Sequence, residues 1–205
     1  CRALSISSFS ISPLISFYNK NYRLTDQNGK ELPYVLRISS NLGNSRVDRE
    51  REYANLKAVK ETPFSAVDIV YFNATTGLMV SQFIEGEFLS SDSLSQDSNL
   101  SESITLLKSL HESDVFFENT FDPFARFFAT VSDLATKGHT CDREVSEMHR
   151  FLRYNHLRIN QAQFTSHPTH NDPSPQNFVR SNGQLQLIDW ELSSQNDPAW
   201  DLAHM

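Results

Sequence analysis

Four polar side chains gather on either side of one short hairpin near the carboxyl end of the chain. Asp172 and Asn177 precede the hairpin in "HNDPSPQN", and Asp189 and Glu191 follow it in "LIDWE". Three carboxylates and an amide brought together in this way repel one another unless a cation lies among them. Arg180 is the only basic residue nearby in the sequence. The pattern therefore constrains the fold: a loop and a strand end must meet around a positive charge.

Phosphoryl transfer uses residues of these types in this order. One Asp accepts the proton of the attacking hydroxyl, an amide a few residues later reaches a metal, and a second Asp holds that metal against the nucleotide phosphates. Asp172, Asn177 and Asp189 fit these roles. Pro173 and Pro175 restrict the loop between the first two. Carboxylate ligands favour a hard cation such as Mg²⁺.

Two other interpretations stay open on the residues alone. "NDPSPQN" could be an Asx-turn in a Pro-rich surface loop, although the later short strand in "LIDWE", which ends in the carboxylate Asp189, favours the metal. His167, His170 and Asp172 could instead form a hydrolytic metal site, which usually needs further His or Cys ligands. The remaining histidines are isolated in the sequence: His111, His139, His149, His156 and His204.

The first half of the chain predicts an antiparallel sheet with one helix. "NYRLTD" and "YVLRIS" flank a hairpin signal at Asn28-Gly29, and "DIVYFN" and "LMVSQFI" flank a second turn, "ATTG". Between them, "VDREREYANLKAV" places Tyr53, Leu56 and Val59 at helical spacing. The expected order is strand, strand, helix, strand, strand, with the helix packed on one face of the sheet.

The second half predicts mostly helix. The Ser- and Asp-rich segment from Ser90 to Ser103 is the best candidate linker, because it has few apolar side chains to bury. After it comes a helix with Ser101 as its N-cap. The predicted apolar stripe of this helix is Leu100, Ile104, Leu107 and His111, and that of a later helix is Val145, Met148 and Leu152.

A hairpin at Asn182-Gly183 closes the pattern. Strand alternation after this turn sends Leu185, Leu187 and Asp189 to one face. Asp189 is then the polar residue at the end of an apolar strand face.

Composition narrows the function classes. The 205 residues suggest one domain, or a small lobe with part of a larger one, and the missing initial Met suggests a fragment. The net charge of −7 gives no electrostatic case for a nucleic-acid partner. Only Cys1 and Cys141 occur, which favours a cytoplasmic protein over a disulfide-rich one. No apolar run is long enough to span a membrane, and the opening residues do not resemble a signal peptide.

From about Asn19 to His204, the chain resembles the choline kinase and aminoglycoside phosphotransferase superfamily, most closely its bacterial choline kinase-like branch. "HNDPSPQN" matches the catalytic loop, "LIDWE" the metal-binding segment, and "DPAWDLAH" the stretch whose Asp201 would brace the loop. The resemblance implies an α+β, protein-kinase-like fold of two lobes. Residues 1–86 would be the nucleotide-binding lobe, with a small antiparallel sheet and one helix, and 87–205 an incomplete, mainly helical catalytic lobe.

The resemblance also assigns site residues. Asp172 would be the catalytic base, and Asn177 and Asp189 would be catalytic metal ligands. Glu191 would lie at or next to the metal. Arg37 in "YVLRIS" would clamp the nucleotide phosphates, oriented by Glu52, with Glu50 as the fallback. The backbone of Gln82, Phe83 and Ile84 would meet adenine, Asn19 would lie in the nucleotide loop, and His111 would be structural.

Two departures from the family pattern bear on activity. The nucleotide loop "LISFYNKNY" lacks Gly, leaving Ser16, Asn19 and Asn21 in place of a close backbone approach to phosphate. Family helices that carry a pocket for a quaternary ammonium would follow Met205. Trp190 and Trp200 could form a wall of that pocket, but a core position is the better expectation for both.

The resemblance implies an ATP- and Mg²⁺-dependent kinase that phosphorylates the hydroxyl of a small cationic alcohol, with choline first. Thiamine, ethanolamine and an aminoglycoside are alternative acceptors, and an acidic pocket would suit each of them. A catalytically inactive nucleotide-binding module is the alternative from another class, favoured by the Gly-poor loop and opposed by the intact set of Asp172, Asn177 and Asp189.

Overall fold

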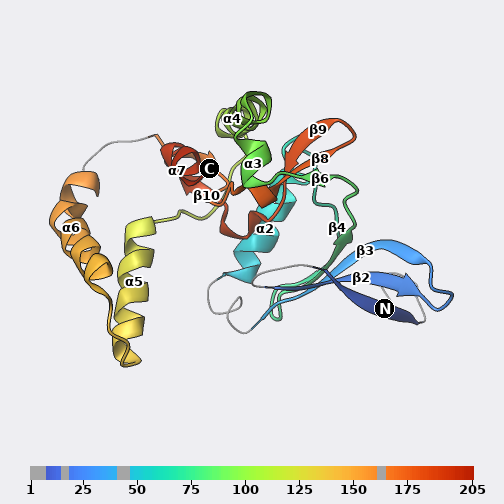
Figure 1. The fold of residues 1–205 in the computed structure, drawn as a ribbon, viewed down its shortest axis with the longest axis horizontal. Helices are drawn as coiled ribbons and strands as arrows, with labels where there is room; N and C mark the ends of the chain where they lie inside the picture. The colour runs from blue at the N-terminus through green and yellow to red at the C-terminus, as the bar shows by residue number, and fades with distance from the viewer. Residues whose placement is uncertain (1–7, 15–18, 41–46, 161–164) are drawn as a thin grey trace.

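The computed structural model describes residues 8–14, 19–40, 47–160 and 165–205, and the α+β fold expected from the sequence is confirmed (Figure 1). Five antiparallel strands form the first sheet in the order β1-β2-β3-β5-β4. They are β1 (Phe9–Leu14), β2 (Lys20–Asp26), β3 (Glu31–Ile38), β4 (Ile69–Asn73) and β5 (Leu78–Gln82). Both predicted hairpins are present. Strand β1, an edge strand paired with β2, was not predicted.

Local chemistry fixes the two hairpin turns. At the β2–β3 turn, the Asp26 carboxylate accepts hydrogen bonds from the backbone N–H groups of Asn28 and Lys30, and Gly29 has a φ of 80°. At the β4–β5 turn, Gly77 has a φ of 68°, and a Cβ there would lie 2.3 Å from Ser39 Oγ. Glycine suits this second turn, because a side chain would be strained at this φ and would have to displace the side chains of Ser39 and Arg49.

The predicted helix of the first half is α2 (Arg49–Val59). The Asp48 side chain caps it by accepting hydrogen bonds from the N–H groups of Glu50 and Arg51. Leu56 and Val59 are buried as predicted. Tyr53 is 37% exposed, and its ring stacks on that of Phe72 with centroids 4.9 Å apart. The apolar stripe therefore faces the core, except at its tyrosine.

The predicted linker is wrong, because the Ser-rich segment is helical. It forms α3 (Ser91–Leu94) and the start of α4 (Asp97–His111). Ser90 and Ser93 form a capping box, and Leu94 and Ser103 are buried. The N-cap of α4 is Gln96, so Ser101 lies inside the helix.

The apolar stripe of α4 also differs in part from its prediction. Leu107 and His111 are buried as expected, together with Leu110, but Ile104 is 41% exposed.

Helices α5 (Pro123–Thr136) and α6 (Arg143–Asn160) lie side by side at the left of Figure 1, apart from the sheet. No side chain of α5 is buried. On α6, Val145 and Leu152 are half-buried, and Met148 is 51% exposed. The predicted stripe on α6 is therefore present in the sequence but only partly covered in the described structure.

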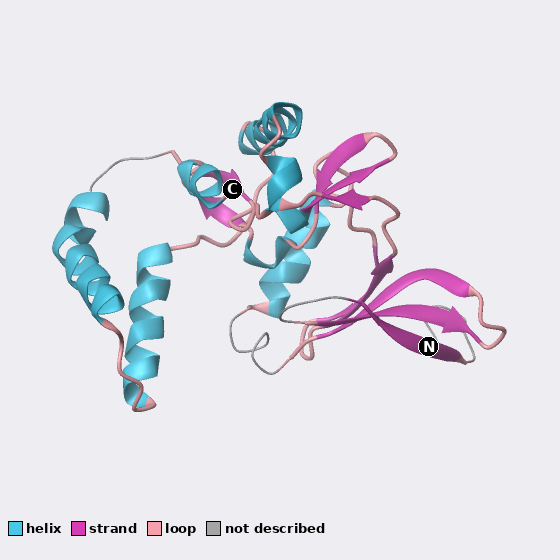
Figure 2. Ribbon diagram, in the orientation of Figure 1, coloured by secondary structure: helices cyan, strands magenta, loops and turns pink. Residues whose placement is uncertain are grey.

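The closing segment is a run of short elements (Figure 2). They are β7 (His167–Thr169), η2 (Pro175–Asn177), β8 (Phe178–Ser181), β9 (Gln184–Leu187), η3 (Trp190–Leu192), β10 (Ser194–Asn196) and α7 (Ala199–His204), and β8 also pairs with β6 (Glu87–Phe88). The predicted hairpin joins β8 to β9, with positive φ at Asn182 and Gly183. Leu185 and Leu187 are buried, as alternation predicts.

One hydrophobic cluster joins the two halves of the chain. Leu56 and Val59 of α2 pack in the same cluster as Leu107 of α4, Leu187 of β9 and Trp190. Trp190 is 1% exposed, so it is a core residue, as expected. The division between residues 86 and 87 into two lobes stays a prediction.

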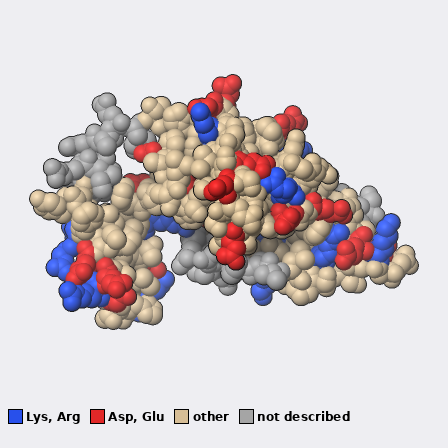
Figure 3. All heavy atoms as spheres, turned by 45° about the horizontal axis from the view of Figure 1, so that its top comes forward, with Lys and Arg blue, Asp and Glu red and all other residues tan. Residues whose placement is uncertain are grey.

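The distribution of charged side chains and the length of the helices bear on which surroundings suit the chain. Acidic and basic side chains are interspersed over the face shown in Figure 3. Within the described part of the chain, no helix is both long enough and apolar enough to cross a membrane.

Candidate active site

The catalytic-loop candidate runs from β7 into η2. The side-chain amide nitrogen of Asn177 donates to the backbone carbonyl of Asp172 at 2.8 Å and to Ser174 Oγ at 3.3 Å. The other atom of the amide, its oxygen, is the one suited to a metal. His204, isolated in the sequence, brings Nδ1 to 3.6 Å from Asp172 Oδ1. The structure thus fixes Asp172 and Asn177 relative to each other.

Asp201 braces this loop. Its fully buried carboxylate accepts the backbone N–H of His170 at 3.0 Å and that of Asn171 at 2.7 Å. His111 Nε2 lies 2.8 Å from the same carboxylate. These contacts are the ones expected of a bracing Asp and a structural His, and they hold the two residues just before Asp172.

Asn171 is a central residue that the sequence analysis missed. Its φ of 65° is left-handed, a conformation that Asn tolerates better than most residues. Its side-chain nitrogen donates to the Leu192 carbonyl at 2.8 Å and to Ser194 Oγ at 2.7 Å, and its oxygen accepts from Asn196. Asn171 therefore ties the catalytic-loop candidate to the segment after Asp189. An Asn directly before Asp172 was the available signal.

The structure contradicts the hydrolytic metal site. His170 is buried, its Nε2 lies 2.8 Å from the Ile188 carbonyl, and its Nδ1 accepts the Asp172 N–H. Burial lowers the pKa of His170, although nearby Asp201 opposes the shift. His167 Nδ1 lies 2.8 Å from the His111 carbonyl. Across the described residues, no group of three or more His, Cys, Asp or Glu side chains could hold a metal.

Asp189 lies just beyond β9 and has a left-handed backbone with a φ of 64°. Burial raises its pKa to about 7, and the negative charge of Glu191 adds to the shift while Arg37 opposes it. A carboxylate in this position gains from a nearby cation, because a cation offsets both the lost hydration and the repulsion from Glu191. The electrostatics therefore fit a metal at Asp189.

Arg37 on β3 pairs with Glu52 on α2. The guanidinium makes two hydrogen bonds to the carboxylate, one of them 3.0 Å from Nη2 to Oε2. Both side chains are buried, and Glu50 points to solvent, so Glu52 is the residue that reaches Arg37. Arg37 Nη1 also lies 4.0 Å from Glu191 Oε2, which places the pair beside the segment that carries Asp189.

Arg49 at the start of α2 is the second residue that the sequence analysis missed. Its Nη1 lies 2.7 Å from Glu52 Oε2 and 2.9 Å from Glu191 Oε2, and its Nη2 lies 3.3 Å from Asn19 Oδ1. Arg180, the one base near the acids in sequence, instead pairs with Glu102 at 2.6 Å. Of the two described arginines beside Glu191, the nearer is therefore Arg49, which is 142 residues away in the sequence.

The nucleotide-loop candidate is described only in part. Asn19 contacts Arg49 and also donates from Nδ2 to Glu191 Oε2 at 3.4 Å. Asn21 lies opposite Arg37 in the β2–β3 ladder. Ser16 lies outside the described residues. Asn19 and Asn21 thus lie at the edge of the same cluster as Arg37.

The hinge candidate continues from β5. Gln82 and Phe83 use their backbone N–H groups within the fold, donating to the Asp68 carbonyl at 2.8 Å and the Pro33 carbonyl at 2.9 Å. No described backbone carbonyl accepts the Ile84 N–H. Of these three residues, Ile84 is therefore the one suited to donate a backbone hydrogen bond to a ligand.

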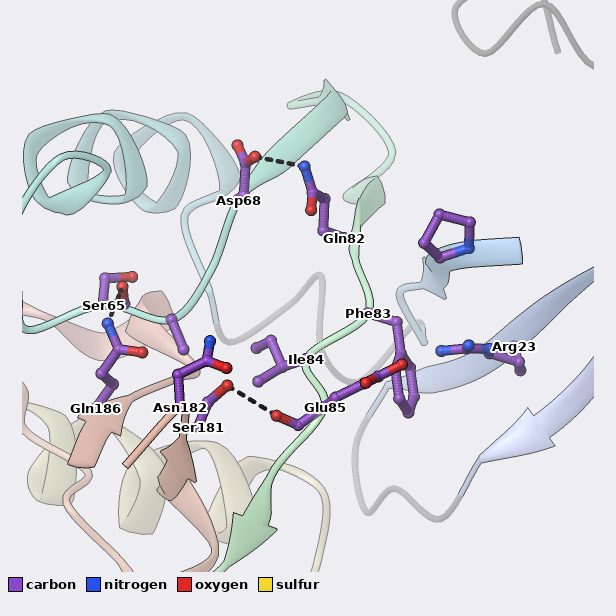
Figure 4. A pocket seen from close by; sticks show the side chains of 12 residues that line it. Arg23, Ser65, Asp68, Gln82, Phe83, Ile84, Glu85, Ser181, Asn182 and Gln186 are labelled. Carbon is purple, nitrogen blue, oxygen red and sulfur yellow. Dashed lines mark hydrogen bonds between the residues drawn. The ribbon is translucent and has the colours of Figure 1, made fainter. Parts of the chain in front are cut away.

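A cavity of about 350 Å³ lies beside the hinge candidate (Figure 4). Arg23 and Phe83 border it on one side, with the guanidinium carbon 3.5 Å from the ring centre. Asn182 and Gln186 of the β8–β9 hairpin border it on the other. Neither Arg37 nor Asp189 lines this cavity, so it is separate from the charged cluster.

The residues around Asp189 fit Mg²⁺. Asn177 and Asp189 offer an amide oxygen and a carboxylate, and Glu191 offers a second carboxylate. Mg²⁺ takes hard oxygen ligands and commonly uses one or two protein carboxylates, leaving the other positions to water and phosphate. A site with few protein ligands therefore suits this metal, and a bound cation would offset the burial and the repulsion from Glu191 that raise the pKa of Asp189.

Comparison with known proteins gives the same family as the motifs. Residues 15–205 match the choline/ethanolamine kinase family. The chain belongs to that family. It is 30% identical over 173 residues to the protein LicA of Haemophilus influenzae, covering 83% of this chain and 64% of LicA. The chain thus spans less than two thirds of this curated relative.

Solved structures agree on the fold. The choline kinase LicA of Streptococcus pneumoniae superposes with a TM-score of 0.82 at 25% identity, covering 99% of this chain and 70% of that one. A LicA structure in complex with AMP gives 0.81 at 25% identity, with the same coverage. The ADP-bound aminoglycoside phosphotransferase APH(2'')-Ib gives 0.63 at 16% identity, covering 98% and 71%. The predicted kinase-like fold and superfamily are confirmed, and the roles of individual site residues stay predictions.

Proposed function

We propose that the protein to which this chain belongs transfers the γ-phosphoryl group of ATP to the hydroxyl of a small cationic alcohol, with choline as the first candidate. One observation carries the proposal. A buried Arg37–Glu52 pair lies beside a segment bearing Asp189 and Glu191, and that segment is hydrogen-bonded to the loop bearing Asp172. Family membership and the similarity to LicA support the choice of choline.

Asp172 would accept the proton of the acceptor hydroxyl. Asp201 and Asn177 fix the backbone on both sides of this carboxylate, and a fixed base needs little rearrangement when the hydroxyl attacks. His204, 3.6 Å away, borders the same carboxylate.

Arg37 would bind the nucleotide phosphates. A guanidinium offers several N–H groups in one plane, so Arg37 can keep its bond to Glu52 and still donate to phosphate. Asn177, Asp189 and Glu191 would hold Mg²⁺, which supplies electrostatic stabilisation of the transferred phosphoryl group. The Ile84 N–H would donate to the base at the hinge. AMP in a LicA structure supports a nucleotide at this fold.

An ADP-release screen tests the proposal. The purified protein is incubated with ATP and Mg²⁺ and with choline, ethanolamine, thiamine or an aminoglycoside in turn, and ADP is measured against a sample without acceptor. We expect choline to give the largest acceptor-dependent release. Acceptor-independent release alone, or a preference for another acceptor, would contradict choline. The absence of any Mg²⁺-dependent shift in melting temperature with nucleotide would contradict the kinase itself.

A further inference from the structure

Arg49 is buried where three elements meet. Its side chain is 4% exposed and contacts Glu52 of its own helix, Glu191 of η3 and Asn19 beside β2. Burial alone would lower its pKa, but Glu52 and Glu191 outweigh burial and raise the pKa. Arg49 is therefore a charged side chain whose described partners include two carboxylates and an amide.

Helix α2 has a second link to the same segment. Asn55 Nδ2 donates to the Ser193 carbonyl at 2.6 Å, two residues after Glu191. Arg49 and Asn55 are six residues apart, or roughly 9 Å along the helix. Two contacts at this separation fix both the position and the direction of α2 against η3. Arg49 provides the contact nearer to Asp189 in the sequence, through Glu191.

No other described cation can take the place of Arg49. Arg37 is committed to Glu52 through two hydrogen bonds and stays 4.0 Å from Glu191. Lys cannot reproduce the arrangement, because an ammonium lacks the planar fork that lets one guanidinium donate to several acceptors in fixed directions. The orientation of the Glu191 carboxylate therefore depends on Arg49 and, more weakly, on Asn19 at 3.4 Å.

We propose that Arg49 is a positioning residue that holds Glu191 in the arrangement needed for metal-nucleotide binding, so that helix α2 and the metal-binding segment act as one unit. The inference rests on the proposed function, because it assigns Glu191 to the Mg²⁺ site. It differs from a phosphate-binding role, since Arg49 Nη1 lies within hydrogen-bonding distance of two carboxylates of the protein.

The test measures the Mg²⁺ requirement of nucleotide binding. Melting temperature is recorded with ADP at a fixed concentration while Mg²⁺ is titrated, for the wild type, Arg49→Gln and Arg49→Lys. Residues that orient metal ligands typically change metal affinity by about 10–100-fold. We expect Arg49→Gln to need at least about tenfold more Mg²⁺, and Arg49→Lys to fall between it and the wild type.

Arg51→Gln is the matched control. Arg51 lies on the same helix, but its side chain is 62% exposed and pairs only with Asp48 among the described carboxylates. Its loss should leave the Mg²⁺ requirement within about twofold of the wild type, as for most exposed substitutions. Each variant is also unfolded in denaturant without metal, so that a change in stability is measured separately.

A double-mutant cycle separates positioning from general stability. If Arg49 acts through Glu191, Arg49→Gln should add little to the Mg²⁺ requirement of a Glu191→Gln protein. Additive effects, or Arg49 variants with the Mg²⁺ requirement of the wild type, would overturn this inference and leave the kinase proposal intact. A wild type without any Mg²⁺-dependent shift would overturn both.

Discussion

The segment from β7 to α7 and the α5–α6 pair differ in how their side chains are stabilised. In the first, buried polar groups are joined to one another: Asp201 accepts two backbone N–H groups, and Asn171 reaches three residues across the loop. In the second, α5 has no buried side chain, and Phe151 on α6 is 61% exposed. The difference shows that hydrogen bonds between buried polar groups hold the candidate site residues of the β7–α7 segment in place. Substitutions in this segment should therefore have larger effects on turnover and stability than substitutions in the α5–α6 pair.

The largest expected effect is on turnover, from Asp172→Ala in the β7–α7 segment. Loss of a general base usually costs roughly 10²–10⁴-fold in rate, and we expect a loss in this range. Nucleotide binding should change little, because Asn177 bonds to the backbone carbonyl of Asp172 and not to its side chain. Turnover and nucleotide-dependent melting are measured on the same preparation. Turnover equal to the wild type would refute the assignment of the base.

The next largest expected effect is a loss of stability from a cavity in the core, on α4, which packs against the β7–α7 segment. Leu107 is 0% exposed, and Leu107→Ala should lower the free energy of unfolding by about 2–5 kcal/mol. Denaturant unfolding at equilibrium measures this change. A loss under about 1 kcal/mol would mean that α4 packs no more tightly than α5, and the contrast between the two regions would disappear.

A smaller effect is expected from pH. Because the pKa of folded Asp189 is raised to about 7, its carboxylate is mostly protonated at pH 6 and mostly ionised at pH 8. Mg²⁺ needs the ionised form, so apparent Mg²⁺ affinity should rise by about tenfold over this range. Nucleotide-dependent melting at both pH values measures the rise. Asp189→Asn should abolish the pH-dependent part, and a rise that persists in this variant would belong to another group.

The same shift has a stability consequence of fixed sign. A folded Asp189 binds its proton more tightly than the unfolded chain does, so between about pH 4 and 7 the folded state holds more protons. Without metal, stability should therefore fall as pH rises through this window, and Asp189→Asn should remove that fall.

The smallest effect is expected on α5. Leu134 is 37% exposed, so Leu134→Ala should change the free energy of unfolding by less than about 1 kcal/mol. It is the matched partner of the Leu107 substitution, because the same change is made on a helix of the α5–α6 pair. A loss as large as that at Leu107 would show that α5 is packed in solution.

Features encoded by neighbouring residues could be predicted from the sequence. The turns at Gly29, Gly77 and Gly183 all have positive φ. Glycine adopts this conformation readily, so the glycines in the sequence predict where these turns lie. The loop around Asp172 and Asn177 was predictable for the same reason, since its proline restraints and its amide lie within six residues.

What the sequence did not reveal depends on contacts at long range or on weak patterns. Arg49 contacts Glu191, which is 142 residues away in the sequence. No pattern in the residues next to either side chain predicts this contact. Strand β1 was missed because Ser and Pro13 interrupt its apolar pattern at a sheet edge. The Ser-rich segment was mistaken for a linker because a capping box and one buried leucine suffice to make it helical.

The continuity of the hydrophobic cluster sets how the molecule comes apart. Since Leu56 and Val59 share one interior with Leu107 and Leu187, the strand-rich and helix-rich halves cannot melt independently without baring that interior to water. The elements that share this cluster should therefore unfold in a single cooperative transition, and a fragment ending near residue 86 would expose the apolar side chains of the cluster and aggregate rather than fold alone.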